Sequence, residues 1–173
     1  QRISEIRSEP VLNTIAFDMN KTFVAFMMSE MISRTVKESE VNKNLFGFLF
    51  DAVVQLDGEQ DADSFHLSFL LHLSSHLGFF PLDNFSSDTR CFNLKDGLFQ
   101  RQQPAHPHWL DIELSECFFS LIKTPLVRCG ELKFSSAIKK NLLSALVMYF
   151  RLHVEGFMGI RSQKILEEVW MDG

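Results

Sequence analysis

The chain has 173 residues, of which 46% are hydrophobic, and its formal net charge is −5. This length and apolar content suffice for one domain with a sizeable core, while the net negative charge argues against a protein that grips nucleic acid over its whole surface. No apolar run reaches the roughly 18 residues that a bilayer span needs, and no secretory signal is recognisable, so we expect a soluble, cytoplasmic protein.

Three cysteines, Cys91, Cys117 and Cys129, form no C-x-x-C pair and leave one over if two of them bridge. Neither a disulfide framework nor a cysteine zinc finger is therefore indicated. We interpret them as reduced thiols.

The N-terminal residues 1–10, "QRISEIRSEP", alternate apolar and polar side chains as a strand does, and no partner strand follows nearby. We expect residues 1–15 to be an exit strand and linker from a preceding domain, and residues 16–173 to form one helical domain.

Two helices are predicted next. Asp18 can cap a helix that runs to about Ser39, and Asn42 can open a second helix that ends at Asp57 and Gly58. The apolar stripe of the first helix is wide, which implies contacts on more than one side; it comprises Phe23, Phe26, Met27, Met31 and Ile32.

A histidine-bearing segment, "FHLSFLLHLSSHLGFFP", spans residues 65–81 and predicts a third helix that is capped by Asp63 or Ser64 and ended by Gly78. His72 and His76 are four apart and share a helix face, as zinc ligands can. The catalytic Glu of the pattern His-Glu-x-x-His is missing between them. The alternative is a core helix with histidines at the edges of its stripe, which consists of Phe65, Leu70, Leu73 and Leu77.

Helical periodicity is lost over residues 81–109, and an Asp-Gly turn between apolar runs in "RCFNLKDGLFQ" predicts a short hairpin. Cys91, His106 and His108 could supply three zinc ligands, with poor spacing. Apolar packing is the alternative way to hold this hairpin.

Helical patterns return over residues 111–123, and a short basic loop follows them. Ser135 can cap a long helix that Gly156 terminates, and "SQKILEEVW" predicts a last short helix. No internal repeat, phosphate-binding loop or nucleophile elbow is present. The predicted fold is all-α, a compact helical bundle with one small β-hairpin insertion.

Four blocks occur in order: "LFGFLFDAVVQLD", "FHLSFLLHLSSHLGFFP", "CFNLKDGLF" and "YFRLHVEGFMGIRSQKILEEV". Together they resemble the C-terminal helical region of the bacterial recombination-mediator family RecO. Many members carry a four-cysteine zinc site after the Gly-Phe-x-Pro turn, whereas "LDNFSSDTRCF" offers Cys91 alone, so we expect neither metal nor cofactor.

The resemblance implies a mediator of DNA repair and homologous recombination rather than an enzyme. It implies binding to RecR and to the acidic C-terminal tail of single-stranded-DNA-binding protein, in support of recombinase loading and strand annealing. It also implies a preceding OB-fold, which would supply much of the DNA contact, so we expect residues 1–173 to bind DNA weakly.

The charge distribution places the partner site in the C-terminal half. From Lys123 to Lys164 there are eight Lys or Arg against two Glu, a balance of +6 that leaves −11 for the remainder. Within the helix after Ser135, four side chains line one face and would suit an acidic peptide with a hydrophobic end. These are Lys140, Ser144, Val147 and Arg151, with Lys139, Arg161 and Lys164 as an auxiliary basic face.

Three alternatives remain open at this stage. The domain could be a scaffold for the OB-fold that the resemblance implies. Its basic face would then only be solvated and would bind no partner. It could be a metal hydrolase that uses His72, His76 and a remote carboxylate such as Glu116. It could also be a sensor with an apolar ligand cavity, given its seven Met and eighteen Phe, although such side chains more often form plain core.

Overall fold

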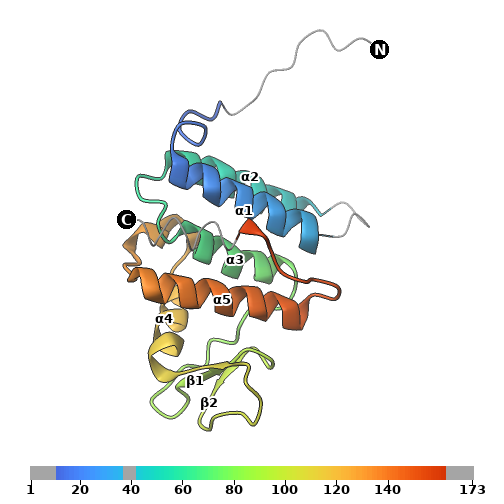
Figure 1. Cartoon of the computed structure of the whole chain (residues 1–173), viewed down its shortest axis with the longest axis vertical. Helices are drawn as coiled ribbons and strands as arrows, with labels where there is room; N and C mark the ends of the chain where they lie inside the picture. The colour runs from blue at the N-terminus through green and yellow to red at the C-terminus, as the bar shows by residue number, and fades with distance from the viewer. Residues whose placement is uncertain (1–10, 37–41, 163–173) are drawn as a thin grey trace.

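The computed structural model describes residues 11–36 and 42–162. Within them lie five α-helices, a short 3-10 helix and a three-stranded antiparallel sheet, so the predicted all-α fold with a small β insertion is confirmed (Figure 1). The predicted strand at residues 1–10 lies outside the described residues. In chain order the elements are α1 (Met19–Thr35), α2 (Lys43–Gly58), α3 (Phe65–His76), β1 (Cys91–Asn93), β2 (Leu98–Gln100), β3 (Trp109–Leu110), α4 (Ile112–Lys123), η1 (Leu126–Glu131) and α5 (Ser136–His153).

The predicted helix starts are set by side-chain caps. The side chains of Asp18, Asn42 and Ser135 each accept a hydrogen bond from a backbone N–H in the first turn of their helix. At α3 the N-cap is Ser64, but its hydroxyl donates instead to the carbonyl of Leu132 at 3.1 Å. This bond ties the start of α3 to the end of η1.

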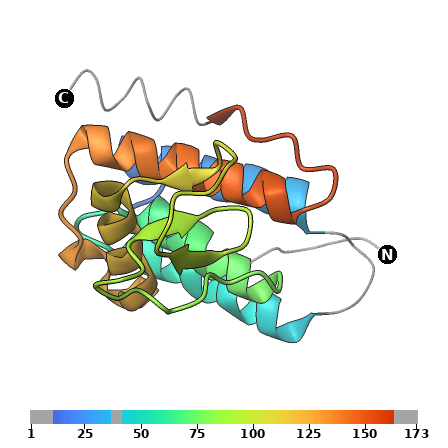
Figure 2. The ribbon, with the colours of Figure 1, turned by 90° about the horizontal axis from the view of Figure 1, so that it is seen from below.

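Helix α3 is the centre of the fold. It contacts α1, α2, α4, α5 and η1, and every residue from Phe65 to Leu71 is buried. Helices α1 and α2 lie on one side of it, and α5 runs along another (Figures 1 and 2). An all-round apolar helix of this kind is a core helix, which explains why its sequence shows no polar face.

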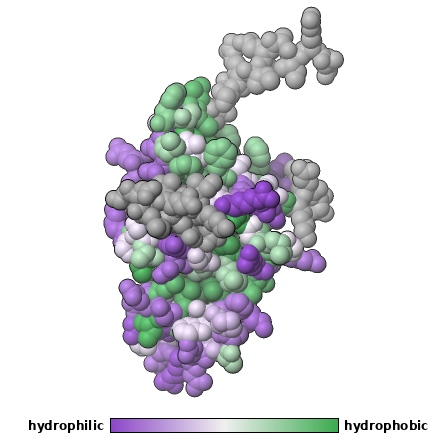
Figure 3. Space-filling view, in the orientation of Figure 1, coloured by the Kyte–Doolittle hydropathy of each residue, from purple (hydrophilic) through white to green (hydrophobic). Residues whose placement is uncertain are grey.

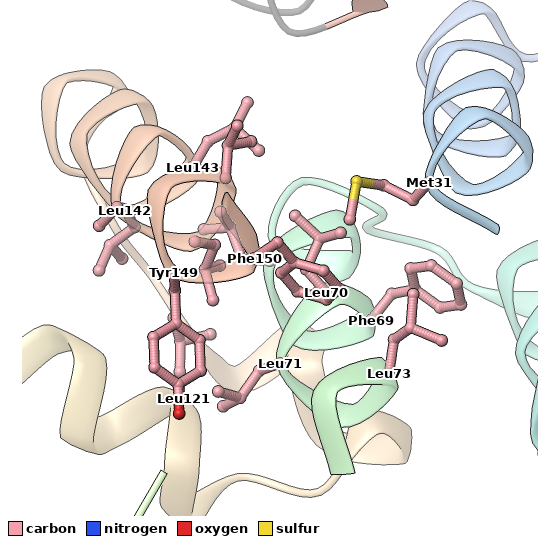
Figure 4. Close-up of a cluster of buried hydrophobic side chains, with 14 of the residues drawn as sticks. Met31, Phe69, Leu70, Leu71, Leu73, Leu121, Leu142, Leu143, Tyr149 and Phe150 are labelled. Carbon is pink, nitrogen blue, oxygen red and sulfur yellow. The ribbon is translucent and has the colours of Figure 1, made fainter. Parts of the chain in front are cut away.

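The core around α3 is built from interdigitating aliphatic and aromatic side chains (Figure 4). Leu71 of α3, Leu121 of α4 and Leu142 of α5 are all fully buried. Tyr149 of α5 points away from α3 towards the sheet and donates its hydroxyl to the carbonyl of Phe79 at 2.6 Å. Burial raises the pKa of this phenol well above its usual value, which keeps it a neutral donor.

The predicted hairpin forms, and β3 extends it to a sheet with the order β2-β1-β3. Phe92 stands opposite Phe99 in one pair and opposite Leu110 in the other. The turn depends on Gly97, whose φ of +69° suits glycine and whose Cβ would lie 2.9 Å from the Tyr149 hydroxyl. The sheet is therefore packed against the bundle at its turn.

Two features differ from prediction. Helix α1 ends at Thr35, not near Ser39, because the Thr35 hydroxyl bonds the Met31 carbonyl and the β-branched Val36 is extended. The segment predicted as a basic loop contains the 3-10 helix η1, whose Cys129 is buried in the core. Of the predicted last helix only Ser162 is described, and its backbone is helical.

Within the described residues, no helix has both the length and the apolar character that a membrane span requires.

A candidate partner-binding face on helix α5

Helix α5 presents part of the predicted face to solvent. Lys140, Ser144 and Arg151 lie on one face of the helix and are exposed. Val147 was expected to supply an apolar strip between the cations, and this expectation is wrong, because Val147 is buried in the core. Helical phase alone therefore did not determine exposure, because Val147 packs into the core cluster.

The guanidinium of Arg151 is held in place by the segment after α5. Its Nε and Nη2 donate to the Met158 carbonyl at 3.1 and 2.6 Å. Gly159 makes this possible, since its φ is +105° and a Cβ there would lie 3.1 Å from Nη2. Two of the five guanidinium N–H groups are thus used for positioning, and the group stays exposed for a carboxylate.

The structure describes two of the three residues expected to form the auxiliary basic face. Lys139 is buried, and its Nζ lies 2.5 Å from Oδ1 of Asp63, so it links α5 to the loop before α3 instead of facing a partner. Arg161 is exposed, and its backbone N–H donates to the carboxylate of Glu30. Lys164 lies outside the described residues.

Acidic side chains neutralise much of the basic segment. Lys133 pairs with Asp61 at 2.6 Å, while Lys123 pairs with Asp83 at 2.8 Å. Arg128 pairs with Glu131, and Lys139 with Asp63 as described above. The local balance of +6 is therefore not one open basic surface. Lys140, Arg151 and Arg161 are exposed among the described residues of this segment.

The histidines of α3 are engaged in packing. His66 is buried, which lowers its pKa to about 3 and keeps the ring neutral. His72 Nε2 lies 3.3 Å from the Thr124 carbonyl, and the ring of His76 stacks on Phe48 with centroids 4.4 Å apart. These contacts match the core-helix interpretation of the segment.

The other groups considered as metal ligands also have protein partners. The Cys91 thiol donates to the Leu110 carbonyl at 3.3 Å, and His106 Nδ1 accepts from the backbone N–H of His108. Glu116 pairs with Arg90. Among the residues of 11–36 and 42–162, no cluster of three or more His, Cys, Asp or Glu could hold a metal ion.

Two depressions were not predicted from the sequence. One, of about 690 Å³, lies beside the sheet and is lined by Arg90, Arg101 and Trp109 together with Asp88, Asp111 and Glu113. Its carboxylates outnumber its cations, which disfavours an anionic ligand. The other, of about 340 Å³, lies on α1 and is mostly apolar. The first joins residues 87–113 across the sheet, whereas the second is lined by residues 12–29 alone.

Exposed phenylalanines mark the α1 and α2 side of the molecule. Phe17, Phe26 and Phe46 are 89%, 67% and 70% exposed. In Figure 3, hydrophobic residues gather at the end of the described part where α1 begins. Such surfaces are typical of contacts with other chain segments or partners.

The chain is similar to known proteins over nearly its whole length. A family model described as "Recombination protein O C terminal" matches residues 16–162. A DNA repair protein RecO of Azobacteroides pseudotrichonymphae is 29% identical over 171 residues, which cover 98% of this chain and 71% of that protein. The DNA repair protein RecO of Flavobacterium johnsoniae is 31% identical over 177 residues, covering 98% and 70%. No solved structure shows significant similarity.

Proposed function

The chain belongs to the RecO family of DNA repair and recombination proteins, and from that premise we propose that it is the partner-binding helical part of a recombination mediator. It binds the acidic C-terminal tail of single-stranded-DNA-binding protein and also RecR, and so supports recombinase loading and strand annealing. It acts through binding and performs no catalysis of its own.

The observation that carries the tail proposal is the positioned guanidinium of Arg151. A side chain already fixed by Met158 loses little rotamer entropy when a carboxylate binds, and a bidentate Arg–carboxylate contact is stronger than a neutral hydrogen bond. Lys140 and Ser144 lie on the same exposed face and add a second cation and a hydroxyl donor. Because Val147 is buried, the hydrophobic end of the peptide must find its apolar contact beside this face.

Titration of an acidic tail peptide against alanine variants tests the proposal. Arg151→Ala and Lys140→Ala should each weaken binding by about 1–3 kcal/mol, as expected for a charge-assisted contact, with thermal stability nearly unchanged. Lys43→Ala is the matched control, because Lys43 is an exposed lysine of α2 on another part of the surface. Unaltered affinity in the folded double variant would remove this face from the tail site.

The second candidate function is a scaffold for an N-terminal OB-fold. The exposed Phe17 and Phe26 favour it, since these side chains suit a covering segment better than water. Pull-downs with RecR and with the tail peptide separate the two functions: a scaffold retains neither partner, whereas a partner-binding domain retains them even without the OB-fold.

A further inference from the structure

Helix α2 carries an apolar row on its outer face. Phe46, Phe50 and Val54 follow one another at intervals of four residues and are 70%, 44% and 39% exposed. The rings of Phe46 and Phe50 stack with centroids 6.4 Å apart. The opposite side of the helix is already used, because Ala52 and Leu56 are fully buried in the core. The outer row is left open by the described residues, and a helix that is apolar on both sides suits burial on both sides.

A second row of α2 lies beside the first and consists of Lys43, Gly47 and Asp51, again four residues apart. A Cβ at Gly47 would have nothing within 4 Å, so this row has an open hollow at its centre. Lys43 and Asp51 are exposed at its two ends, and neither forms an ion pair within residues 11–36 and 42–162. The outer face of α2 thus combines apolar bulk, a hollow and two opposite charges.

This arrangement is complementary to a second copy of itself. Gly47 lies midway between Lys43 and Asp51, about 6 Å from each along the helix axis. A two-fold axis through Gly47, perpendicular to α2, brings Lys43 of one copy opposite Asp51 of the other, and the same contact forms twice. Side chains of a helix lean towards its N-terminus, so Phe50 of each copy would lie over the hollow at Gly47 of the other. A partner of different sequence would not require charges placed symmetrically about the hollow.

We propose that α2 is a dimerisation face at which two copies of the chain pack α2 against α2 in antiparallel orientation, centred on Gly47. The row from Phe46 to Val54 is buried in the contact, and two Lys43–Asp51 ion pairs fix its register. A single helix pair is a small interface, so the dimer forms reversibly and depends on protein concentration. Helices α2 and α5 lie on opposite sides of α3 (Figures 1 and 2), so contacts at α2 leave the candidate face on α5 open in both copies.

Sedimentation velocity of the full-length protein over a range of concentrations tests this face. We expect the wild type to pass from monomer to dimer as the concentration rises. Phe50→Asp should raise the dissociation constant of the dimer at least about tenfold, because it would bury a charge in the apolar row. The exposed position of Phe50 leaves the core of the monomer intact, which melting temperatures check. Ile112→Asp is the matched control, since Ile112 is 51% exposed at the start of α4, beside the sheet.

Charge reversal tests the register of the two helices. Lys43→Asp and Asp51→Lys should each weaken the dimer, because each places like charges opposite one another twice. An equimolar mixture of the two variants should dimerise again, since both contacts of the mixed dimer then join opposite charges. Gly47→Gln should weaken the dimer without loss of monomer stability, because the space around Gly47 is open and glutamine favours a helix more than glycine does.

Three results would overturn the proposal. The first is a wild type that stays monomeric at every concentration, which would leave the row to another domain or partner. The second is dimerisation that survives Phe50→Asp or that Ile112→Asp removes equally. The third is a mixture of Lys43→Asp and Asp51→Lys that dimerises no better than either variant alone.

Discussion

His66 shows how a titratable side chain serves the core of this domain. It lies in the first turn of α3, is only 1% exposed, and is kept neutral because burial, with a smaller contribution from the charge of Lys139, lowers its pKa to about 3. In the unfolded chain the same ring takes up a proton near pH 6.5. Between these two values the unfolded state binds more protons, so stability falls as the pH falls.

We therefore predict that acidification from pH 7 to pH 4 lowers the melting temperature of the wild type, and that His66→Gln lowers it less over the same range. Glutamine is polar and of similar size but carries no proton-linked charge. Thermal melts at several pH values measure the difference. His106→Gln, in the loop before β3, is the control, and a melting profile of His66→Gln parallel to that of the wild type would contradict the prediction.

Single residues also show where sequence reasoning ends. The caps Asp18, Asn42 and Ser135 were predictable, because a cap depends only on residues three positions away. The burial of Lys139 and Val147 was not, because Lys139 pairs with Asp63 and Val147 joins the core only when distant parts of the chain meet on folding. Their helical phase was correct, and their exposure was set by the tertiary structure.

At the scale of elements, Asp57 connects the N-terminal turn to α2. Its three backbone hydrogen bonds lower the pKa of its carboxyl from 3.8 to about 2. The folded state therefore holds this group ionised more strongly than the unfolded chain does. The resulting stabilisation is present above about pH 4 and is lost as the pH falls towards 2.

Asp57→Asn should lower the melting temperature at pH 7, and the difference from the wild type should narrow as the pH approaches 2. The amide offers one neutral acceptor oxygen in place of a charged carboxylate that accepts three N–H groups. Asp51→Asn, on an exposed position of the same helix, provides the comparison. A difference in melting temperature that stays constant with pH would show that the charge of Asp57 is not responsible.

The sheet is joined to the bundle through one buried ring. Phe92 of β1 packs against Phe99 of β2 and Phe118 of α4, with centroids 4.8 and 4.5 Å away. The Asp-Gly turn predicted the hairpin because it is a local signal. It could not predict β3, since Trp109 and Leu110 join the sheet only by pairing with Asn93 and Phe92 across a long connection.

Phe92→Ala should destabilise the protein by about 3–5 kcal/mol, since it leaves a cavity where the sheet meets α4. Urea unfolding measures this loss. Leu82→Ala, at a position that is 56% exposed, should change the stability by far less. A small effect of Phe92→Ala would mean that the sheet contributes little to the cooperative core.

At the scale of the whole molecule, acidic and basic segments are folded onto one another. The loop between α2 and α3 brings Asp61 and Asp63 to Lys133 and Lys139, which lie more than 70 residues later in the chain. The sequence correctly showed one basic and one acidic part but not that they pair. These pairs reduce the positive charge that the basic segment can offer to phosphate, and the net charge of −5 also repels phosphate.

We predict weak binding of residues 1–173 to single-stranded DNA, with an affinity that falls as salt rises. If Lys140, Arg151 and Arg161 each neutralise one phosphate, the slope of log K against log salt is about −2, because each contact with a single strand contributes roughly −0.7. Fluorescence anisotropy with a labelled oligonucleotide over a range of salt concentrations measures both quantities. Replacing the three residues by alanine should remove nearly all of the slope, whereas Lys123→Ala, which breaks the Lys123–Asp83 pair, should leave it unchanged. Tight binding at physiological salt, or a much steeper slope, would show that phosphate contacts extend well beyond this face of α5, and the acidic-peptide site would then have to be sought elsewhere on the bundle.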